Sequence, residues 1–202
     1  MCQNQEELEQ DLKKLKGVAT TLHLDVVDGK FANNETFQFE FKLNKNFKYQ
    51  AHLMINNPEK WIKEHFLEID LFIPHIEKIK DVKKHIVELQ LKDKKIAFAL
   101  LPETKVSSLI KFLPQIDYIL VLTVQPGFYG SKFLPLELKK ISEIKKINPR
   151  IEVIVDGGMN PETIKLAARA GADIFVSGSY TTKAKKPKER IEILERCVKL
   201  IE

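Results

Sequence analysis

The chain of 202 residues is long enough to bury one hydrophobic core, and with 44% hydrophobic residues it has the composition of an ordinary globular protein. Its net charge of +5 comes from lysines spread beside glutamates, which argues against a nucleic-acid partner and favours an anionic substrate. No apolar run approaches the roughly 18 residues of a membrane span, and the polar start does not resemble a secretory signal. The length fits one domain over residues 1–202. Cys2 and Cys197 lie at opposite ends and have no metal-ligand spacing, so we expect a reduced protein of the cytoplasm.

Apolar residues at helical spacing predict a first helix over residues 5–16, with Gly17 as its stop. Strands are then expected over residues 20–27, 49–55, 69–76, 95–101, 118–124, 151–155 and 174–176. Further helices are expected from Pro58, over residues 77–91, after Pro102 to about Phe112, and over residues 135–147, 161–171 and 187–201. Phe37, Phe39 and Phe41 alternate with polar residues and predict an extended segment.

The regular alternation of strand, turn and helix is typical of repeated βα units with a parallel sheet. The chain opens on a helix that has no strand before it, and seven strands follow. An α/β fold of the (β/α)8 TIM-barrel type, with its first strand lacking or truncated, explains this count better than a doubly wound sheet.

The first expected strand carries His23 and Asp25 two positions apart. Because side chains on a strand alternate between two faces, the imidazole and the carboxylate project from the same face. Asp28-Gly29 ends the strand and places both residues near its C-terminal end, where sites form in parallel α/β folds. An exposed polar face on an edge strand is the alternative explanation for this pair taken alone.

Two other strands carry residues of the same kinds, since His52 lies in the strand over residues 49–55 and Asp156 follows the strand over residues 151–155. Taken singly, His52 is better explained as a core histidine, and the alternative explanation of Asp156 is a turn residue before Gly157-Gly158. Together with His23 and Asp25 they form a donor set for one first-row divalent ion, with Zn, Fe, Mn and Co all compatible. Four such residues at strand ends are hard to explain as packing.

A second group of motifs predicts an anion site. Asp156-Gly157-Gly158 and Ser177-Gly178-Ser179 end successive strands and precede helices. Glycines let backbone N–H groups approach a phosphate, and a helix N-terminus favours its charge. In barrels the loops after the seventh and eighth strands are a frequent phosphate site. Gly127 and Gly130, after the preceding strand, are expected to add a third loop.

These motifs resemble the ribulose-phosphate 3-epimerase family, (β/α)8 barrel enzymes of the pentose phosphate pathway. The matching segments run in the family's order between residues 22 and 180: LHLDVVDGKFANN, AHLMINNPEKWI, IPHIE, TVQPGFYGSKF, IVDGGMNPETI, AGADIF and VSGSY. The resemblance implies a metal-dependent isomerase that interconverts D-ribulose 5-phosphate and D-xylulose 5-phosphate through an enediolate. A homo-oligomer is left open.

The resemblance also assigns roles to residues of this chain. It makes His23, Asp25, His52 and Asp156 the metal ligands, and Asp25 and Asp156 the acid/base pair as well. Two carboxylates on opposite sides of a carbon next to a ketone serve an inversion, because one removes a proton and the other returns one. The substrate and its phosphate are expected to contact His52, Gly127, Phe128, Gly130, Gly157, Gly158, Gly178 and Ser179.

Some residues depart from the family's pattern. Nothing here matches the family's opening Ser-Ile-Leu strand, and Val27 and Leu122 stand where the family usually has methionines near the metal. Tyr129 and Ser131 replace the usual Gly and Gln of the loop that closes over the substrate. Two other functions therefore stay open: an epimerase of a related ketose phosphate such as allulose 6-phosphate, and a non-catalytic sugar-phosphate-binding barrel.

Overall fold

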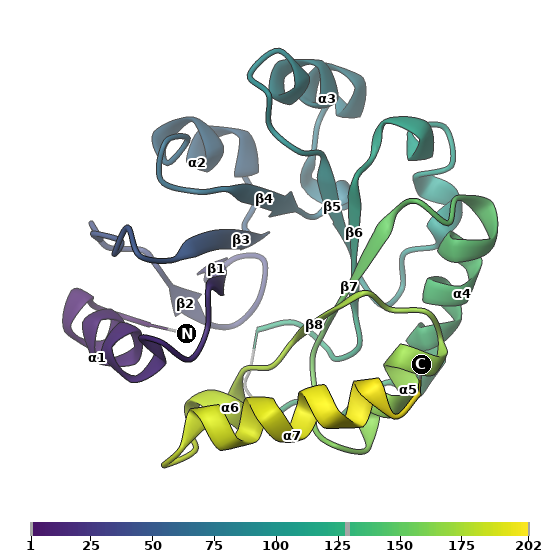
Figure 1. The fold of residues 1–202 in the computed structure, drawn as a ribbon. Helices are drawn as coiled ribbons and strands as arrows, with labels where there is room; N and C mark the ends of the chain where they lie inside the picture. Colours follow the sequence, from purple (N-terminus) through teal and green to yellow (C-terminus); the bar gives the residue numbers. More distant parts are fainter. Residues whose placement is uncertain (1, 128–129, 202) are drawn as a thin grey trace. The chain divides into compact units, whose positions relative to one another are not determined.

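The computed structural model describes residues 2–127 and 130–201. The chain divides into two compact units, one up to Ala99 and the other from Leu100 onward (Figure 1). Each unit is built around parallel strands that alternate with helices. None of the described helices is both long enough and apolar enough to span a bilayer.

The first unit holds a sheet in the order β2-β1-β3-β4. Strands β1, β3 and β4 run parallel, whereas the two-residue β2 pairs antiparallel with the end of β1. Its elements are α1 (Gln5–Leu15), β1 (Thr21–Asp28), β2 (Glu35–Thr36), β3 (Lys48–Met54), α2 (Pro58–Glu64), β4 (Leu71–Pro74), η1 (Ile76–Lys78) and α3 (Val82–Gln90). Strand β5 (Ala97–Leu100) crosses into the second unit.

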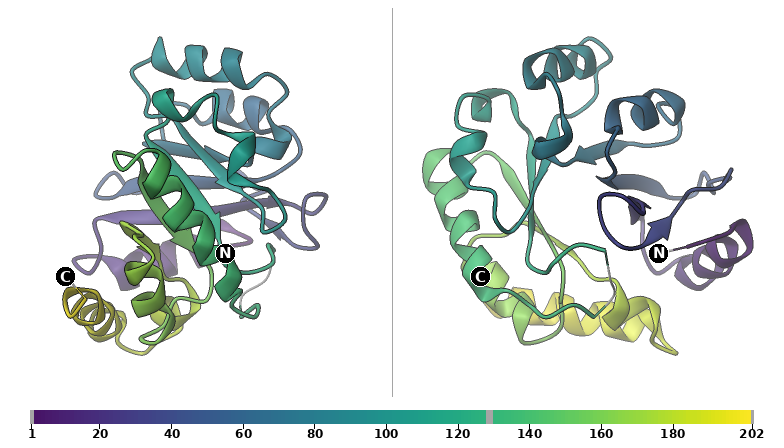
Figure 2. Two further views of the ribbon diagram at one scale, coloured as in Figure 1. Left: turned by 90° about the vertical axis from the view of Figure 1, so that its right-hand side faces the viewer. Right: turned by 180° about the vertical axis from the view of Figure 1, so that it is seen from behind.

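The second unit continues with the parallel strands β6, β7 and β8. Its elements are η2 (Val106–Ser108), η3 (Leu113–Gln115), β6 (Tyr118–Leu122), η4 (Pro135–Glu137), α4 (Leu138–Ile147), β7 (Glu152–Asp156), α5 (Thr163–Arg169), β8 (Ile174–Val176), α6 (Ser179–Thr182) and α7 (Pro187–Lys199). The closing helix α7 packs against α5 and α6, as Figure 2 shows.

Local signals explain where several helices begin. The side chain of Asn4 accepts a hydrogen bond from the backbone N–H of Glu7 (2.9 Å) and caps α1, whose first turn is acidic. Asp81 caps α3 in the same way through the N–H of Lys84 (3.0 Å). Such caps satisfy N–H groups that have no partner within the helix, and the acidic residues complement the helix dipole.

In both units an aspartate that precedes a strand forms hydrogen bonds to the preceding strand and sets its register. Asp70 stands before β4, and its carboxylate accepts the N–H of Tyr49 on β3 (2.7 Å) while its own N–H binds the Tyr49 carbonyl (2.9 Å). Asp173 stands before β8 and makes the same two bonds to Val153 on β7, at 2.7 and 3.0 Å. In both pairs the aspartate ties its strand to the start of the preceding one, which fixes the register of β4 on β3 and of β8 on β7.

The seven expected strands correspond to β1 and β3–β8, so that prediction is confirmed over the described residues. The helix expected after Pro102 is wrong, because the segment forms only the short 3₁₀ turns η2 and η3. The hydroxyl of Ser108 bonds back to the carbonyl of Lys105 (2.9 Å), which competes with α-helical bonding, and the N–H of Leu109 binds the carbonyl of Val106 (2.9 Å) in a 3₁₀ turn.

The segment with three phenylalanines also differs from the expectation. Only Glu35 and Thr36 form a strand, and Phe37 has a left-handed backbone with φ of 54° that ends the pairing. The rings of Phe37, Phe39 and Phe41 instead pack on one another with centroids 5.3–6.1 Å apart. Their alternation therefore reflects a local aromatic cluster and not an extended strand.

Candidate metal centre

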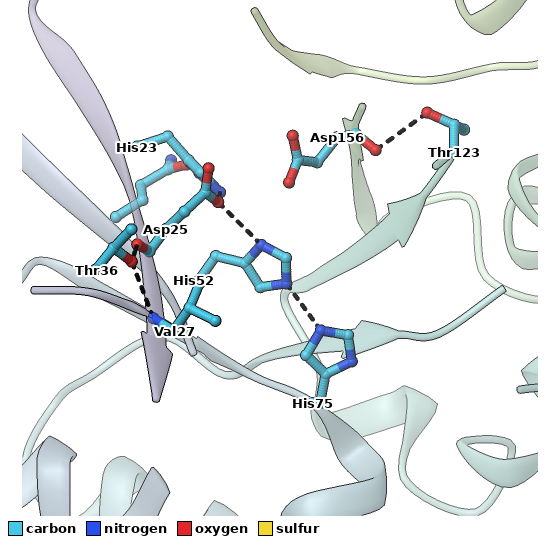
Figure 3. Close-up of polar contacts among 9 residues, drawn as sticks. His23, Asp25, Val27, Thr36, His52, His75, Thr123 and Asp156 are labelled. Carbon is cyan, nitrogen blue, oxygen red and sulfur yellow. Dashed lines mark hydrogen bonds and ion pairs between the residues drawn. The ribbon is translucent and has the colours of Figure 1, made fainter. Parts of the chain in front are cut away.

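Three of the predicted ligands lie together in the first unit. In the register of β1 with β3, Asp25 stands directly opposite His52, and His23 lies two residues before Asp25 on the same face. The Oδ1 atom of Asp25 is 3.4 Å from Nδ1 of His52 and 3.8 Å from Nε2 of His23 (Figure 3). These three atoms all lie within 4.8 Å of one another.

The arrangement fits a divalent ion better than it fits hydrogen bonds alone. Hydrogen bonds from nitrogen to oxygen are normally 2.7–3.2 Å long, and both nitrogen-to-oxygen distances here are longer. Two imidazole nitrogens and one carboxylate oxygen are the ligands that zinc and other first-row divalent ions prefer in catalytic sites. The group around Asp25 can therefore hold a metal ion.

Electrostatics keep the Asp25 carboxyl ionised. Burial acts to raise its pKa, but the adjacent imidazoles of His52 and His23 outweigh burial and hold the pKa below its ordinary value. An ionised carboxylate is the form that ligates a metal or accepts a proton.

Thr36 on β2 holds the backbone of β1 beside this group, and sequence reasoning missed it. Its hydroxyl donates to the carbonyl of Asp25 and accepts the N–H of Val27 (3.0 Å) (Figure 3). The side chain thereby bridges two backbone groups of β1 next to a proposed ligand. No local pattern points to this role, because it depends on the antiparallel pairing of β2 with β1.

His75 is a second residue that sequence reasoning missed. It follows β4, is fully buried, and places Nε2 2.9 Å from Nε2 of His52. Its Nδ1 lies 3.3 Å from a carboxylate oxygen of Glu77. Burial lowers the pKa of His75 to about 4, so the ring is neutral at pH 7. The sequence holds one indication of this role, since His75 directly follows β4, the strand after the one that carries His52.

Asp28 orders the loops at the ends of β1 and β3. Its carboxylate accepts backbone N–H groups from Lys30 (3.0 Å), Phe31 (2.8 Å) and Asn56 (2.8 Å). Burial acts to raise its pKa, but these three hydrogen bonds outweigh it and lower the pKa. Asp28 thus connects the loop after the strand of His23 and Asp25 to the loop after the strand of His52.

Replacing Asp28 with asparagine is expected to lower the free energy of unfolding by roughly 1–2 kcal/mol at pH 7, because hydrogen bonds to a charged acceptor are stronger than those to a neutral one. The folded-state pKa lies below the unfolded value of about 3.9, so the contribution is present above that value and is lost as pH falls through the folded pKa. Urea unfolding at pH 7 and pH 3 measures it. Asp11→Asn, which removes a surface ion pair with Lys14, serves as control and should change stability by less than about 0.5 kcal/mol. An undiminished difference at pH 3 contradicts the prediction.

In the second unit, Asp156 ends β7 and is half-buried. Its carbonyl accepts both the N–H (2.8 Å) and the hydroxyl (3.0 Å) of Thr123, so the backbone at this strand end is held firmly (Figure 3). Gly157 follows with a φ of 115°, and a Cβ there would lie 2.5 Å from a methyl group of Val124. The strand can therefore end in this way only with glycine after Asp156.

The predicted phosphate residues lie in the loops of the second unit. Gly158 has a φ of 69°, Gly178 caps α6, and Ser179 is the first residue of that helix. Gly127 and Gly130 also have positive φ, at 104° and 82°. Phe128, expected to contact the substrate, lies outside the described residues.

Comparison with known proteins gives the family. The chain matches the ribulose-phosphate 3 epimerase family over residues 1–182. The chain belongs to the ribulose-phosphate 3-epimerase family. It is 33% identical to the ribulose-phosphate 3-epimerase of Candida glabrata over 203 residues, which cover 90% of this chain and 82% of that protein. The enzyme of Aquifex aeolicus is 33% identical over 187 residues (88% and 84%), and the cytoplasmic isoform of Oryza sativa is 34% identical over 190 residues (89% and 83%). This member of the family is accordingly an isomerase of the epimerase type.

Solved structures agree on the fold. A crystal structure of KGPDC from Streptococcus mutans aligns with a TM-score of 0.68 at 16% identity, over 96% of this epimerase and 93% of that chain. The 3-hexulose-6-phosphate synthase of Salmonella typhimurium aligns with the same TM-score at 14% identity, over 100% and 97%. At such identities the likeness concerns the fold alone. The α/β class and the (β/α)8 barrel type expected from the sequence are confirmed.

Proposed function

We propose that this epimerase is a metal-dependent ribulose-phosphate 3-epimerase that interconverts D-ribulose 5-phosphate and D-xylulose 5-phosphate. The observation that carries the proposal is the convergence of the His23, Asp25 and His52 ligand atoms within 4.8 Å of one another, in a chain that matches the family over residues 1–182. The family also supports one catalytic domain over residues 1–202, with a cytoplasmic location and a homo-oligomeric state as further expectations.

We assign the divalent ion to His23, Asp25, His52 and Asp156. The first three residues fit it by the nature of their donor atoms and by their spacing. Asp156 is added because it ends β7, its backbone is held by Thr123, and the family resemblance gives it the same role. When bound, the ion supplies Lewis-acid stabilisation for the negative charge that develops on the substrate oxygens.

The two aspartates then share the proton transfers. One carboxylate removes the proton from C3 of the ketose phosphate, and the electron pair of the broken C–H bond moves toward the neighbouring carbonyl. The other residue, in its protonated form, donates a proton to the opposite face of C3, which inverts the centre. The lowered pKa of Asp25 supports its part as a base in the resting enzyme.

The phosphate is assigned to the backbone of the second unit, at Gly158, Gly178 and Ser179. Backbone N–H groups bind an anion without a lysine, and glycine allows them to approach it closely. Gly157 orients the loop, and the segment with Gly127, Phe128 and Gly130 is expected to cover the substrate. Binding the phosphate far from C3 provides binding energy that positions the reacting carbon.

Deuterium incorporation tests this function. Wild-type protein loaded with a divalent ion is incubated with ribulose 5-phosphate in D₂O, and NMR follows both the appearance of xylulose 5-phosphate and deuterium at C3. We expect both. Finding neither, while the intact ketose phosphate still binds, would leave the non-catalytic barrel. Faster turnover of allulose 6-phosphate in the same assay would instead identify the related epimerase.

Substitution of Gly178 with alanine is expected to raise KM and the inhibition constant of inorganic phosphate roughly 10- to 100-fold, with a smaller change in kcat. The added methyl group keeps the anion from backbone N–H groups, and a hydrogen bond to a charged group contributes roughly 1.5–3 kcal/mol. The φ of Gly178 is −84° with a ψ of −95°, so alanine is not forced into the left-handed region there. Thermal unfolding shows whether the variant folds. An unchanged inhibition constant in folded protein would place the phosphate elsewhere.

A further inference from the structure

We propose that His75 and Glu77 form a series of polar contacts behind His52 that fixes the tautomer of the His52 ring and directs the lone pair of its Nδ1 atom to the metal ion. This inference rests on the metal site of the proposed function. His75 and Glu77 are positioning residues, because they act on the site through His52.

Four side chains of the first unit lie in sequence along this series of contacts. Asp25 Oδ1 is 3.4 Å from His52 Nδ1, and His52 Nε2 is 2.9 Å from His75 Nε2 (Figure 3). At the far end, His75 Nδ1 is 3.3 Å from Glu77 Oε2, an ion-pair distance slightly longer than a normal hydrogen bond. This series of four side chains thus has a carboxylate at each end and two imidazoles between them, and both imidazole rings are fully buried.

The number of ring N–H protons limits how these four side chains can be bonded. The series has three contacts, from Asp25 to His52, from His52 to His75 and from His75 to Glu77. Two neutral imidazoles bring one N–H each, so one of the three contacts is left without a proton. The nitrogens of His52 and His75 are 2.9 Å apart, so one of the two N–H groups must lie between them. The remaining N–H lies at one end, and the other end carries a nitrogen lone pair that faces a carboxylate.

A metal ion beside Asp25 would remove the repulsion between the nitrogen lone pair and the carboxylate in only one of the two proton placements. His75 donates its Nδ1 proton to Glu77, its Nε2 accepts the Nε2 proton of His52, and Nδ1 of His52 is left as a lone pair. This nitrogen and the Asp25 carboxylate would then be free of a proton between them and could hold the ion, which would supply the positive charge between them. In the reverse arrangement Nδ1 of His52 carries the proton and cannot ligate a metal.

The surroundings of His75 keep its ring in place. The Phe31 ring packs against it with centroids 4.7 Å apart, and Lys78 Nζ lies 5.4 Å from the centroid of Phe31. The backbone of His75 pairs in parallel with Ala99, and its carbonyl accepts the N–H of Lys78 (3.0 Å) at the start of η1. Both the backbone and the ring are therefore held, as a residue that orients a ligand must be.

Three variants distinguish a role of His75 in orienting His52 from a role in packing alone. His75→Phe keeps an aromatic ring but removes the acceptor and the donor. His75→Gln restores both, because its amide oxygen accepts and its amide nitrogen donates. His85→Phe is the matched control, since His85 is also a buried histidine of the first unit that packs on an aromatic ring, at 5.7 Å from Phe98. Thermal unfolding of the metal-free proteins reports any general damage.

The first measurement is the dissociation constant for Zn²⁺, obtained by competition with a chelator. We expect His75→Phe to weaken binding roughly 10- to 100-fold, as for other residues that orient metal-binding histidines, and His75→Gln and His85→Phe to stay within about threefold of wild type. Wild-type affinity in His75→Phe would overturn the proposal. So would an equal loss in His75→Gln, because packing alone would then explain the effect.

The second measurement reads the tautomers directly in Zn²⁺-loaded wild-type protein, by NMR of ¹⁵N-labelled histidines. We expect the proton of His52 on Nε2 and that of His75 on Nδ1. A proton on Nε2 of His75 would overturn the proposal even if His75→Phe fails to fold. Wild-type protein that binds no divalent ion would instead contradict the proposed metal site itself, so the two failures are distinguishable.

Discussion

Replacing Asp25 or Asp156 with asparagine is expected to lower the rate of epimerisation at least ~10²-fold in protein that still carries its metal ion, because a positioned acid or base contributes at least this much. Asparagine keeps the shape of the side chain and one oxygen ligand but cannot take up a proton at neutral pH. The rate is measured as conversion of ribulose 5-phosphate to xylulose 5-phosphate, with the metal content determined on the same samples.

The two variants are also expected to differ from each other in isotope exchange. If each aspartate serves one face of C3, Asp25→Asn retains proton exchange with the solvent for only one of the two epimers, and Asp156→Asn retains it for only the other. Asp11→Asn, on the surface of α1, is the control and should behave as wild type. Normal turnover in either metal-loaded variant would refute the assignment of two bases. Loss of exchange from both epimers in both variants would point to a single shared base.

Removal of the ion is expected to produce a loss of similar size. Protein treated with a chelator should lose at least ~10²-fold in kcat/KM and regain it when a divalent ion is restored, because a Lewis acid contributes several kcal/mol to stabilising the transition state. His52→Ala should bind less than one ion per chain under conditions that saturate the wild type, since it removes one of the converging ligand atoms. Metal analysis and activity assays on the same preparations measure both effects.

His85→Ala is the matched control for His52→Ala, because both remove a buried imidazole from the first unit and only His52 faces Asp25. It should lose stability without losing the ion. Full metal occupancy in His52→Ala would exclude His52 from the site. Full activity in metal-free wild-type protein would show that the epimerase needs no ion, and the carboxylates would then have to stabilise the charge with other groups.

Much of the fold could be read from local patterns. The alternation of apolar residues along β1 and β3 predicts strands because side chains of an extended chain point to two faces in turn, and this holds whatever the strand pairs with. The same alternation places His23 and Asp25 on one face. The segment after Pro102 could not be read in this way, since Val106, Leu109 and Leu113 are buried at a spacing that suits an α-helix as well as the observed 3₁₀ turns.

The sequence by itself therefore determined the order of strands and helices, the family and the kinds of side chain that stand at the strand ends. Only the tertiary structure decided which of them meet. The register of β1 against β3 places Asp25 opposite His52, the pairing of β2 brings Thr36 to the backbone of Asp25, and burial after β4 turns His75 toward His52. These contacts join residues 11 to 27 positions apart, so they depend on hydrogen bonding and packing between strands, which a local pattern does not contain.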